Sequence, residues 1–444
     1  MEEPPVSAPK AHSLIYGVED RLPLGTALLV SFQQVAAMVV GVITPALILS
    51  EILKFPAADT AYLVSMALLA AALGTAIQST RFGLIGSGLL SVTGTSFAFL
   101  QPLIRSGQAG GLPLMFGMSL ATVPVQFVLA PFLPHFRRVF TPLISGVVVV
   151  LIGLSIIPEA MRGIVEPVAP GAPPWAGGAI AAVVIASVLF AQAFGRPRTR
   201  MASILVGVFV GYVVCGSLGY LHAPPPSQAW ITLPRILPHQ LAYRADFFIP
   251  FAFIYVVSIL ESMGDITATS QLSGLDTKTP EHWLRIRGGV LGDAFTSAIA
   301  AIIGSFPSTT YAQNNGVIQI TGVASRHIGK IMAVILAVLG LFPGVARWVT
   351  AMPPPVLGGM ALLLFGLVAV AGLRLIIGAG LDHRNSLIVA VSLGVGLGAP
   401  TQPEWLGHMP SLVRTLLESG VSAGGIVALV LNLALPGGKP AADH

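Results

Sequence analysis

Long apolar runs recur along almost the whole chain, from about Leu24 to Leu435. A membrane-spanning helix needs about 20 mostly apolar residues, so the length has room for roughly a dozen or more spans joined by short links. Only 9% of the residues are charged, whereas a soluble domain carries about a quarter. The chain lacks the polar residues to cover a water-exposed surface of its size. We therefore predict an all-α polytopic membrane protein.

The basic residues predict its orientation. Breaks between the apolar runs, among them 105–110 and 158–175, divide the chain into about 14 transmembrane helices. Every second link, starting with the one at Arg81, is basic, and together these links hold 13 of the 23 Lys and Arg residues. Because basic residues gather in cytoplasmic loops, these links and both termini are expected in the cytoplasm, with the helices in the cell (inner or plasma) membrane. These loops also explain the net charge of +5, so we expect the lipid bilayer and no nucleic acid as a partner.

Two apolar stretches have the same pattern of proline and glycine. Pro142 is followed by glycines four and eleven residues later, and Pro355 by glycines at the same spacing. The two prolines lie 213 positions apart, which is close to seven spans. An odd number of spans per repeat turns the second copy upside down, and such 7+7 inverted repeats are typical of secondary transporters. Chance is the alternative, since Gly and Pro are common in membrane helices.

Two polar segments interrupt the apolar pattern at matching places in the two halves. Residues 86–97 are rich in glycine and hydroxyl groups, and residues 304–316 contain a proline, hydroxyls and amides. Extended backbone within a bilayer occurs only where protein buries it or a cavity hydrates it. We predict two broken helices that carry short extended segments at the midplane, each followed by a helix whose N–H groups can bind a ligand oxygen. Surface loops are the alternative, although neither segment is highly charged.

Three carboxylates fall inside apolar spans, namely Glu261, Asp265 and Asp293. A carboxylate at the centre of a spanning helix costs on the order of 3 kcal/mol, so such residues usually serve a function. Glu261 and Asp265 share a helical face, where mutual repulsion and burial favour a retained proton. This arrangement favours proton coupling. The alternative is a structural network in which the acids only bond neighbouring hydroxyls, such as those of Thr267, Thr269 or Ser297.

One motif carries a family resemblance. Residues 313–322 read Gln-Asn-Asn-Gly-Val-Ile-Gln-Ile-Thr-Gly. They resemble the signature of the nucleobase–ascorbate transporter family (nucleobase:cation symporter-2). Upstream, Glu261-Ser-Met-Gly-Asp265 and Gly292-Asp293 resemble the family's acidic positions, in the same order. The resemblance extends over nearly the whole chain, from Glu19 to the Gly-Gly pair at 437–438.

The resemblance implies a fold and a movement. Family members have fourteen helices in two inverted sevens, divided into a substrate-carrying core domain and a gate domain, commonly as a homodimer. By that pattern the core comprises 24–133 and 246–348, and the gate 134–245 and 349–436. Residues 1–23 and 437–444 are the two tails. The core is expected to slide against the gate as an elevator.

The resemblance also implies a binding site for a nucleobase. Glu261 would accept hydrogen bonds from ring N–H groups, and Gln313 would offer one donor and one acceptor to the amide-like edge of the base. Phe97 and Tyr311 would contact the ring faces. The backbone N–H groups of both aromatics and of Ala312 would add polar contacts.

Further residues are expected to organise this site. Asp265, Asp293 and Asn314 would hold it together and tune protonation, and Thr321 completes the signature. The set resembles the purine branch, and especially bacterial xanthine permeases, because the uracil branch typically has Glu at 313 and His at 265. Uracil remains the less favoured alternative within the family.

Two departures from the family pattern concern Gln34 and Ser96. Many members have His where this chain has Gln34, so any detail that depends on that His does not transfer. Ser96 replaces an Asn of one xanthine-specific type. The smaller Ser leaves more room near the ring, which favours uric acid or guanine as further substrates.

Other classes fit the sequence less well. An enzyme would need a nucleophile with its base or a metal cluster, yet the nine His residues lie mostly in links or tails and none pairs with Cys at metal spacing. No phosphate-binding loop for ATP is present, so the expected driving force is the proton gradient, with no cofactor and no metal. An anion exchanger or channel of the related sulfate-transporter class would favour a basic residue at its site.

Overall fold

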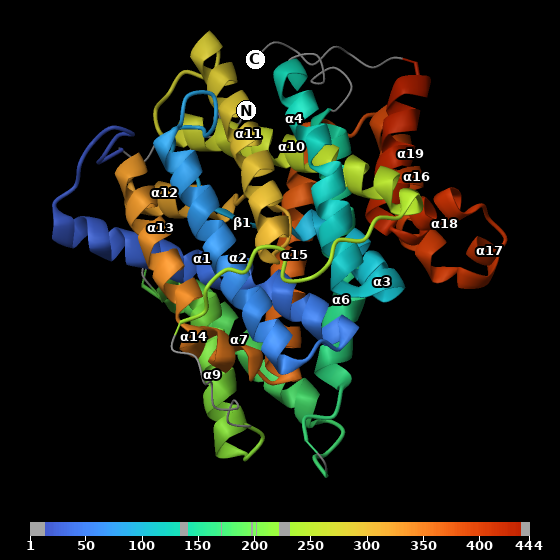
Figure 1. Cartoon of the computed structure of the whole chain (residues 1–444), viewed down its shortest axis with the longest axis horizontal. Helices are drawn as coiled ribbons and strands as arrows, with labels where there is room; N and C mark the ends of the chain where they lie inside the picture. Colours follow the sequence, from blue (N-terminus) through green and yellow to red (C-terminus); the bar gives the residue numbers. More distant parts are fainter. Residues whose placement is uncertain are drawn as a thin grey trace, which may run out of the picture.

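The computed structural model describes residues 14–133, 141–169, 171–196, 199–200, 202–221 and 231–436. Most of these residues are helical (Figure 1). Eight helical stretches in this part of the chain are long and apolar enough to cross a membrane. They are α1 (Leu24–Leu53), α2 (Ala57–Thr80), the η1–α3–α4–η2 stretch (Phe97–Phe132), α6 (Pro142–Val165), α7 (Ala176–Phe194), η3–α10 (Ala245–Leu272), α11 (Pro280–Ile303) and α15 (Pro354–Gly378).

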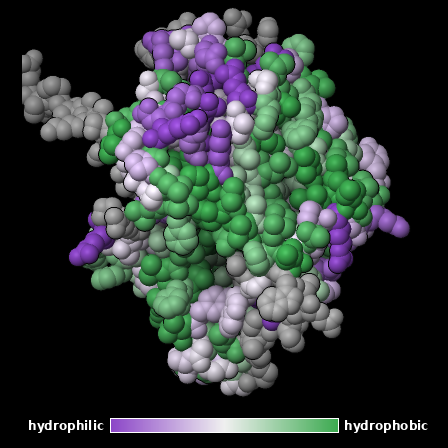
Figure 2. Space-filling model, turned by 60° about the vertical axis from the view of Figure 1, so that its left-hand side comes forward, coloured by the Kyte–Doolittle hydropathy of each residue, from purple (hydrophilic) through white to green (hydrophobic). Residues whose placement is uncertain are grey.

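Shorter helices complete the described part. Four are apolar or largely apolar, namely α9 (Ser203–Ser217), α13 (Arg326–Leu341), α16 (His383–Gly398) and α19 (Gly420–Ala434). The others are α12 (Gln313–Thr321), α14 (Pro343–Thr350), α17 (Pro403–Gly407) and α18 (Ser411–Glu418). Figure 2 shows apolar side chains covering much of the middle of one face, with hydrophilic side chains gathered mainly towards its upper end. This distribution fits helices that lie in lipid.

Helix packing divides most elements into two groups. α1, α2, α10, α11 and α13 pack mainly on one another and around the two strands, whereas α6, α7, α9, α15, α16 and α19 pack mainly among themselves. The closest helix pair in the second group is α6 with α15, which run antiparallel. A Cβ atom added at Gly153 would lie 2.6 Å from the backbone of α15, and one at Gly372 would lie 2.5 Å from the backbone of α6. Only glycine permits this approach.

The two strands are β1 (Thr93–Thr95) and β2 (Ser308–Thr310). They pair antiparallel, with Thr93 opposite Thr310 and Thr95 opposite Ser308. Both strands are buried, and each is followed by a helix, η1 running into α3 (Leu100–Thr122) after β1 and α12 after β2. Extended segments at residues 86–97 and 304–316 were expected, and the structure contains them.

Two predicted breaks differ in detail. Near residues 105–110 the helix α3 continues, but its backbone departs from helical geometry at Gly110 and Gly111, where Gly111 has a φ of 64°. Near 158–175 the helix α6 continues through Pro158 to Val165. Pro158 lacks a backbone N–H and carries a bulky ring, but it does not end the helix. Membrane helices tolerate proline because neighbouring groups and local adjustments of the backbone satisfy the freed carbonyl.

Candidate functional site

The site is built where β2 and α12 lie along α10. Three polar contacts join them in the same order along both segments. Ser262 on α10 contacts the Thr309 hydroxyl (3.1 Å), Thr310 donates to Asp265 Oδ2 (3.4 Å), and Thr269 donates to Asn315 Oδ1 (2.6 Å). The strand and the half-helix α12 are therefore held beside the acidic part of α10.

Asp293 on α11 is completely buried beneath this contact. Its Oδ1 accepts from Gln78 Nε2 (2.9 Å) and its Oδ2 from Ser262 Oγ (2.5 Å). The side-chain amide of Gln78, on α2, also donates to the Gly289 carbonyl (2.9 Å), and its oxygen Oε1 accepts from Ser87 N–H (3.0 Å). Asp293 thus links α11 to both α2 and α10 next to the site.

Glu261 differs from the other two acids. It lies one turn, about 6 Å, before Asp265 on α10, and it is half-buried. Its carboxylate makes no hydrogen bond or ion pair to another residue in the described part of the chain, although Asp293 and Tyr311 lie within electrostatic range. A half-buried carboxylate without a protein partner is free to accept hydrogen bonds from a ligand.

Gln313 begins the half-helix α12. Gln313 and the preceding Ala312 are exposed, and a Cβ added at Gly316 would meet nothing within 4 Å, so this face of α12 borders open space. The first N–H groups of a helix have no partner within that helix. The N-terminal end of α12 therefore presents an amide side chain and backbone donors beside α10.

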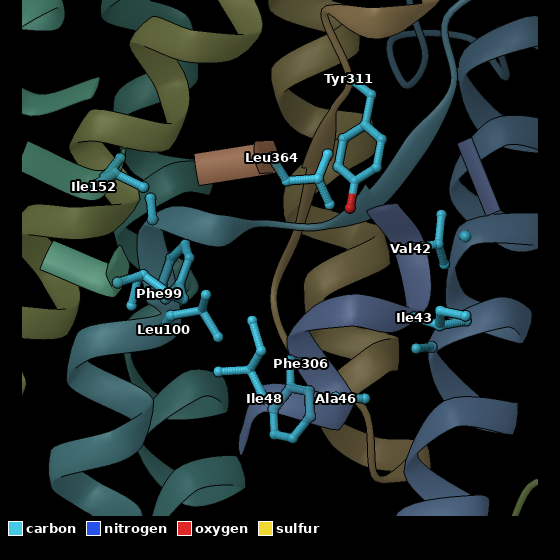
Figure 3. Close-up of a cluster of buried hydrophobic side chains, with 14 of the residues drawn as sticks. Val42, Ile43, Ala46, Ile48, Phe99, Leu100, Ile152, Phe306, Tyr311 and Leu364 are labelled. Carbon is cyan, nitrogen blue, oxygen red and sulfur yellow. The ribbon is translucent and has the colours of Figure 1, made fainter. Parts of the chain in front are cut away.

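The two expected aromatic residues meet each other. The rings of Phe97 and Tyr311 are nearly parallel, with centroids 6.1 Å apart, and Phe97 also meets Phe365 of α15 edge-on at 5.3 Å. Tyr311 lies beside a cluster of buried apolar side chains from α1, α3, α6 and α15 (Figure 3). Its hydroxyl donates to the Gly41 and Thr95 carbonyls.

The backbone N–H of Tyr311 is already used. It donates to the Val92 carbonyl at 2.9 Å, so it cannot supply the ligand contact expected from the sequence. The corresponding contact at this position would have to come from Ala312 or Gln313, where α12 starts. The next backbone N–H groups along the chain, those of Asn314 and Asn315, are already used, because they donate to the carbonyls of residues 311 and 312.

The remaining expected residues are mostly buried or bonded to the protein backbone. Asn314 is buried and donates to the Leu90 carbonyl (2.5 Å), while Thr321 bonds the Val317 carbonyl within α12. Ser96 and Gln34 are completely buried, and their side-chain polar atoms have no hydrogen-bond partner among the described residues. Gln34 lies on the face of α1 that also carries Gly41, which packs against Tyr311.

Gln78, Ser262 and Thr309 were not singled out from the sequence. Of these three residues, only Gln78 could have been noticed in the sequence, because its amide lies within the apolar, alanine-rich run of α2. The hydroxyls named in the alternative structural network bond elsewhere. Thr267 donates to the Met263 carbonyl, Thr269 to the Asp265 backbone carbonyl and to Asn315, and Ser297 to the Ser308 carbonyl. None of these three hydroxyls bonds an acidic side chain in the described structure.

A metal centre finds no support in the described residues, which contain no group of three or more His, Cys, Asp and Glu side chains placed to hold an ion. The site consists of carboxylates, amides, hydroxyls and the aromatic rings of Phe97 and Tyr311. Such groups recognise a small polar ring by hydrogen bonds and stacking.

Sequence comparison identifies the family. The model of a permease family matches residues 25–405. Xanthine permease XanP of Escherichia coli (strain K12) is 40% identical over 449 residues, which cover 97% of this chain and 96% of that protein. The chain belongs to the nucleobase–ascorbate transporter family. Xanthine permease XanQ of the same organism is 39% identical over 96% of this chain, and a purine permease of Emericella nidulans is 32% identical over 95%.

Solved structures show the same fold at low identity. The transmembrane domain of the cyanobacterial bicarbonate transporter BicA aligns with a TM-score of 0.59 at 14% identity, covering 92% of this chain and 99% of that one. Murine Slc26a9, an anion transporter in the inward-facing state, aligns with a TM-score of 0.65 at 12% identity, covering 94% and 68%. These structures show the fold. The family membership and the permease relatives show that the chain is a multi-pass membrane transporter and not an enzyme.

Proposed function

We propose that this chain is a symporter that takes up a purine base, with xanthine as the preferred substrate, together with protons. The observation that carries the proposal is that a carboxylate without a partner among the described residues, Glu261, and an exposed amide, Gln313, lie on two helices that pack together. Relatives that share about 40% of its residues are named xanthine permeases. Gln at 313 and Asp at 265 agree with the purine branch.

The chemistry of xanthine suits these groups. Xanthine presents ring N–H groups and carbonyl oxygens along its edges. The Glu261 carboxylate accepts from the N–H groups, the Gln313 amide both donates and accepts, and the free N–H groups at the start of α12 donate to a carbonyl. Phe97, which is only partly buried, offers its ring to one face of the base.

The charge balance of the site supports proton coupling. None of the ion pairs among the described residues involves Glu261, Asp265 or Asp293. Three neighbouring carboxylates without a Lys or Arg partner disfavour full ionisation, so a proton is the natural counter-charge. The proton gradient would then drive uptake, without a cofactor.

The packing supports an elevator movement. The helices assigned to the core, 24–133 and 246–348, largely pack with one another, as do those assigned to the gate, 134–245 and 349–436. The fourteen-span, 7+7 inverted arrangement is supported by the α6–α15 pair, which carries the repeated Pro-Gly pattern, and by the pairing of β1 with β2. We assign the termini to the cytoplasm and expect a homodimer.

Purified protein in proteoliposomes tests this function. Radiolabelled xanthine should accumulate when the lumen is made alkaline relative to the outside, and the accumulation should collapse when a protonophore removes the gradient. Bicarbonate and sulfate serve as control substrates, because the fold is shared with anion transporters. Accumulation of either anion without xanthine uptake would overturn the proposal.

A second substrate test concerns Ser96. The buried hydroxyl of Ser96 has no partner among the described residues. Because the side chain is smaller than that of Asn, we expect it to leave more room beside the ring of the bound base. We expect uric acid or guanine to compete with xanthine, and Ser96→Asn to weaken that competition. If neither base inhibits xanthine uptake, the proposed broader specificity is wrong, whereas the proposal of xanthine transport stands.

A further inference from the structure

The residues before α1 form a strap at the C-terminal end of α12, the short helix that carries Gln313. The strap is residues 14–21, a segment that the sequence indicated only as part of a tail. Tyr16 forms a parallel bridge with Val323, and the Val18 side chain is buried in an apolar cluster with residues of α10, α11 and the segment before β1. The strap therefore belongs to the packed structure.

The strap closes the C-terminal end of α12. Gly322 caps this helix with a φ of 66°, and its carbonyl accepts the N–H groups of both Ile15 (2.8 Å) and Tyr16 (3.1 Å). The Tyr16 carbonyl in turn accepts from Ala324 N–H (2.9 Å). The last turns of helices leave carbonyls without partners, and here a distant segment continues the hydrogen bonding just beyond that end.

A charged pair fastens the strap to the next helix. Glu19 Oε2 accepts from Nε (2.9 Å) and Nη2 (2.7 Å) of Arg326, the first residue of α13. Arg326 also donates through Nη1 to the Thr80 carbonyl at the end of α2 (3.4 Å), and its backbone N–H donates to the Val18 carbonyl (3.0 Å). The Ser325 hydroxyl adds a bond to the Asp20 carbonyl (2.5 Å).

Holding both ends matters because α12 is short. It has nine residues and a length of about 13 Å, and helices of this size are not stable on their own. Its N-terminal end is held by β2 and by the Thr269–Asn315 bond, and its C-terminal end by the strap. One face of α12 borders open space, so packing on that side does not restrain it.

We propose that Glu19 is a positioning residue that, through the strap and Arg326, holds α12 and thereby sets the orientation of Gln313 at the substrate site. The part that concerns substrate rests on the proposed function. Glu19 does not touch the site and acts through the helix that carries Gln313. Loosening the strap lets α12 tilt or unwind from its C-terminal end, which weakens recognition of the base.

The test compares Glu19→Gln with Glu159→Gln. Glu159 forms an ion pair with Arg162 within α6, far along the chain from the strap, so it controls for the loss of one surface carboxylate. Hydrogen exchange of the peptide covering 316–324 should speed up by about fivefold in Glu19→Gln and stay unchanged in Glu159→Gln. Glu19→Asp should restore most of the protection.

Uptake kinetics provide the second measurement. Glu19→Gln should raise the KM for xanthine by about threefold to tenfold, with less than a twofold change in Vmax at equal membrane expression. Unchanged exchange, or a KM equal to that of Glu159→Gln, would overturn the positioning role. If the wild type transports no purine while exchange at 316–324 still rises in Glu19→Gln, the proposed function fails and the strap's hold on α12 stands.

Discussion

Replacing Glu261 by Gln separates ligand binding from folding. Glu261 is half-buried and has no hydrogen-bond partner in the described structure, so Gln at this position leaves no protein group unpaired. In the proposed site, the change removes a charge-assisted hydrogen bond to the base, worth about 1.5–3 kcal/mol. Binding should weaken by about tenfold to 150-fold, while the unfolding temperature stays within about 1 °C of the wild type.

Asp293→Asn is the matched comparison, since it also neutralises a carboxylate of the same region. Asp293 accepts from Gln78 and Ser262, and Asn keeps one acceptor while its NH2 group can donate to the Ser262 hydroxyl. Replacing two charge-assisted bonds by neutral ones should lower the free energy of unfolding by about 1 kcal/mol and leave base affinity nearly unchanged. Uptake should fall more than binding, because Asp293 is one of the three acids to which we assign proton coupling.

Equilibrium binding of radiolabelled xanthine in detergent, thermal unfolding and proteoliposome uptake measure these three quantities on the same preparations. Wild-type xanthine affinity in Glu261→Gln would refute a role for this carboxylate in binding. A loss of stability in Glu261→Gln as large as that in Asp293→Asn would also refute it, since that result would reveal a structural partner for Glu261.

Three further variants follow from the same contacts. Gln313→Ala should lower xanthine affinity by at least about tenfold without changing the unfolding temperature, because the amide is exposed and has no partner among the described residues; unchanged binding would remove Gln313 from the site. Gln78→Leu should lower the free energy of unfolding by about 2 kcal/mol, since it deprives buried Asp293 of a donor, and a thermal shift assay measures this loss. Gly94→Ala should cost about 1–3 kcal/mol in the same assay, because the new Cβ would lie 2.6 Å from Tyr311 Cζ; wild-type stability would show that the Tyr311 ring can move.

The features predictable from the sequence are those that lipid makes costly. Acidic residues within apolar runs stand out because charge is disfavoured there, and this signal marks Glu261, Asp265 and Asp293. Polar, glycine-rich interruptions stand out for the same reason, and both contain a strand in the structure. The core and gate assignments and the elevator movement remain predictions.

Contacts between distant segments were less accessible to sequence reasoning. Gln78 lies in an ordinary apolar helix, and its importance comes from Asp293, 215 positions away. The N–H of Tyr311 is taken by Val92, which depends on how two remote segments align. The strap at 14–21 has tail-like composition, and only the position of Arg326 in space shows what Glu19 binds.

The pairing of β1 with β2 has a consequence for biosynthesis. Thr93–Thr95 leaves the ribosome more than two hundred residues before Ser308–Thr310, yet each strand supplies backbone partners to the other. Inside a bilayer an unpaired extended segment cannot be left facing lipid. The nascent chain must therefore keep the first strand shielded by water, by the insertion machinery or by neighbouring helices until the second arrives. Fragments that end before residue 308 should be recognised and degraded as unfinished, whereas two separately expressed halves can complete one another.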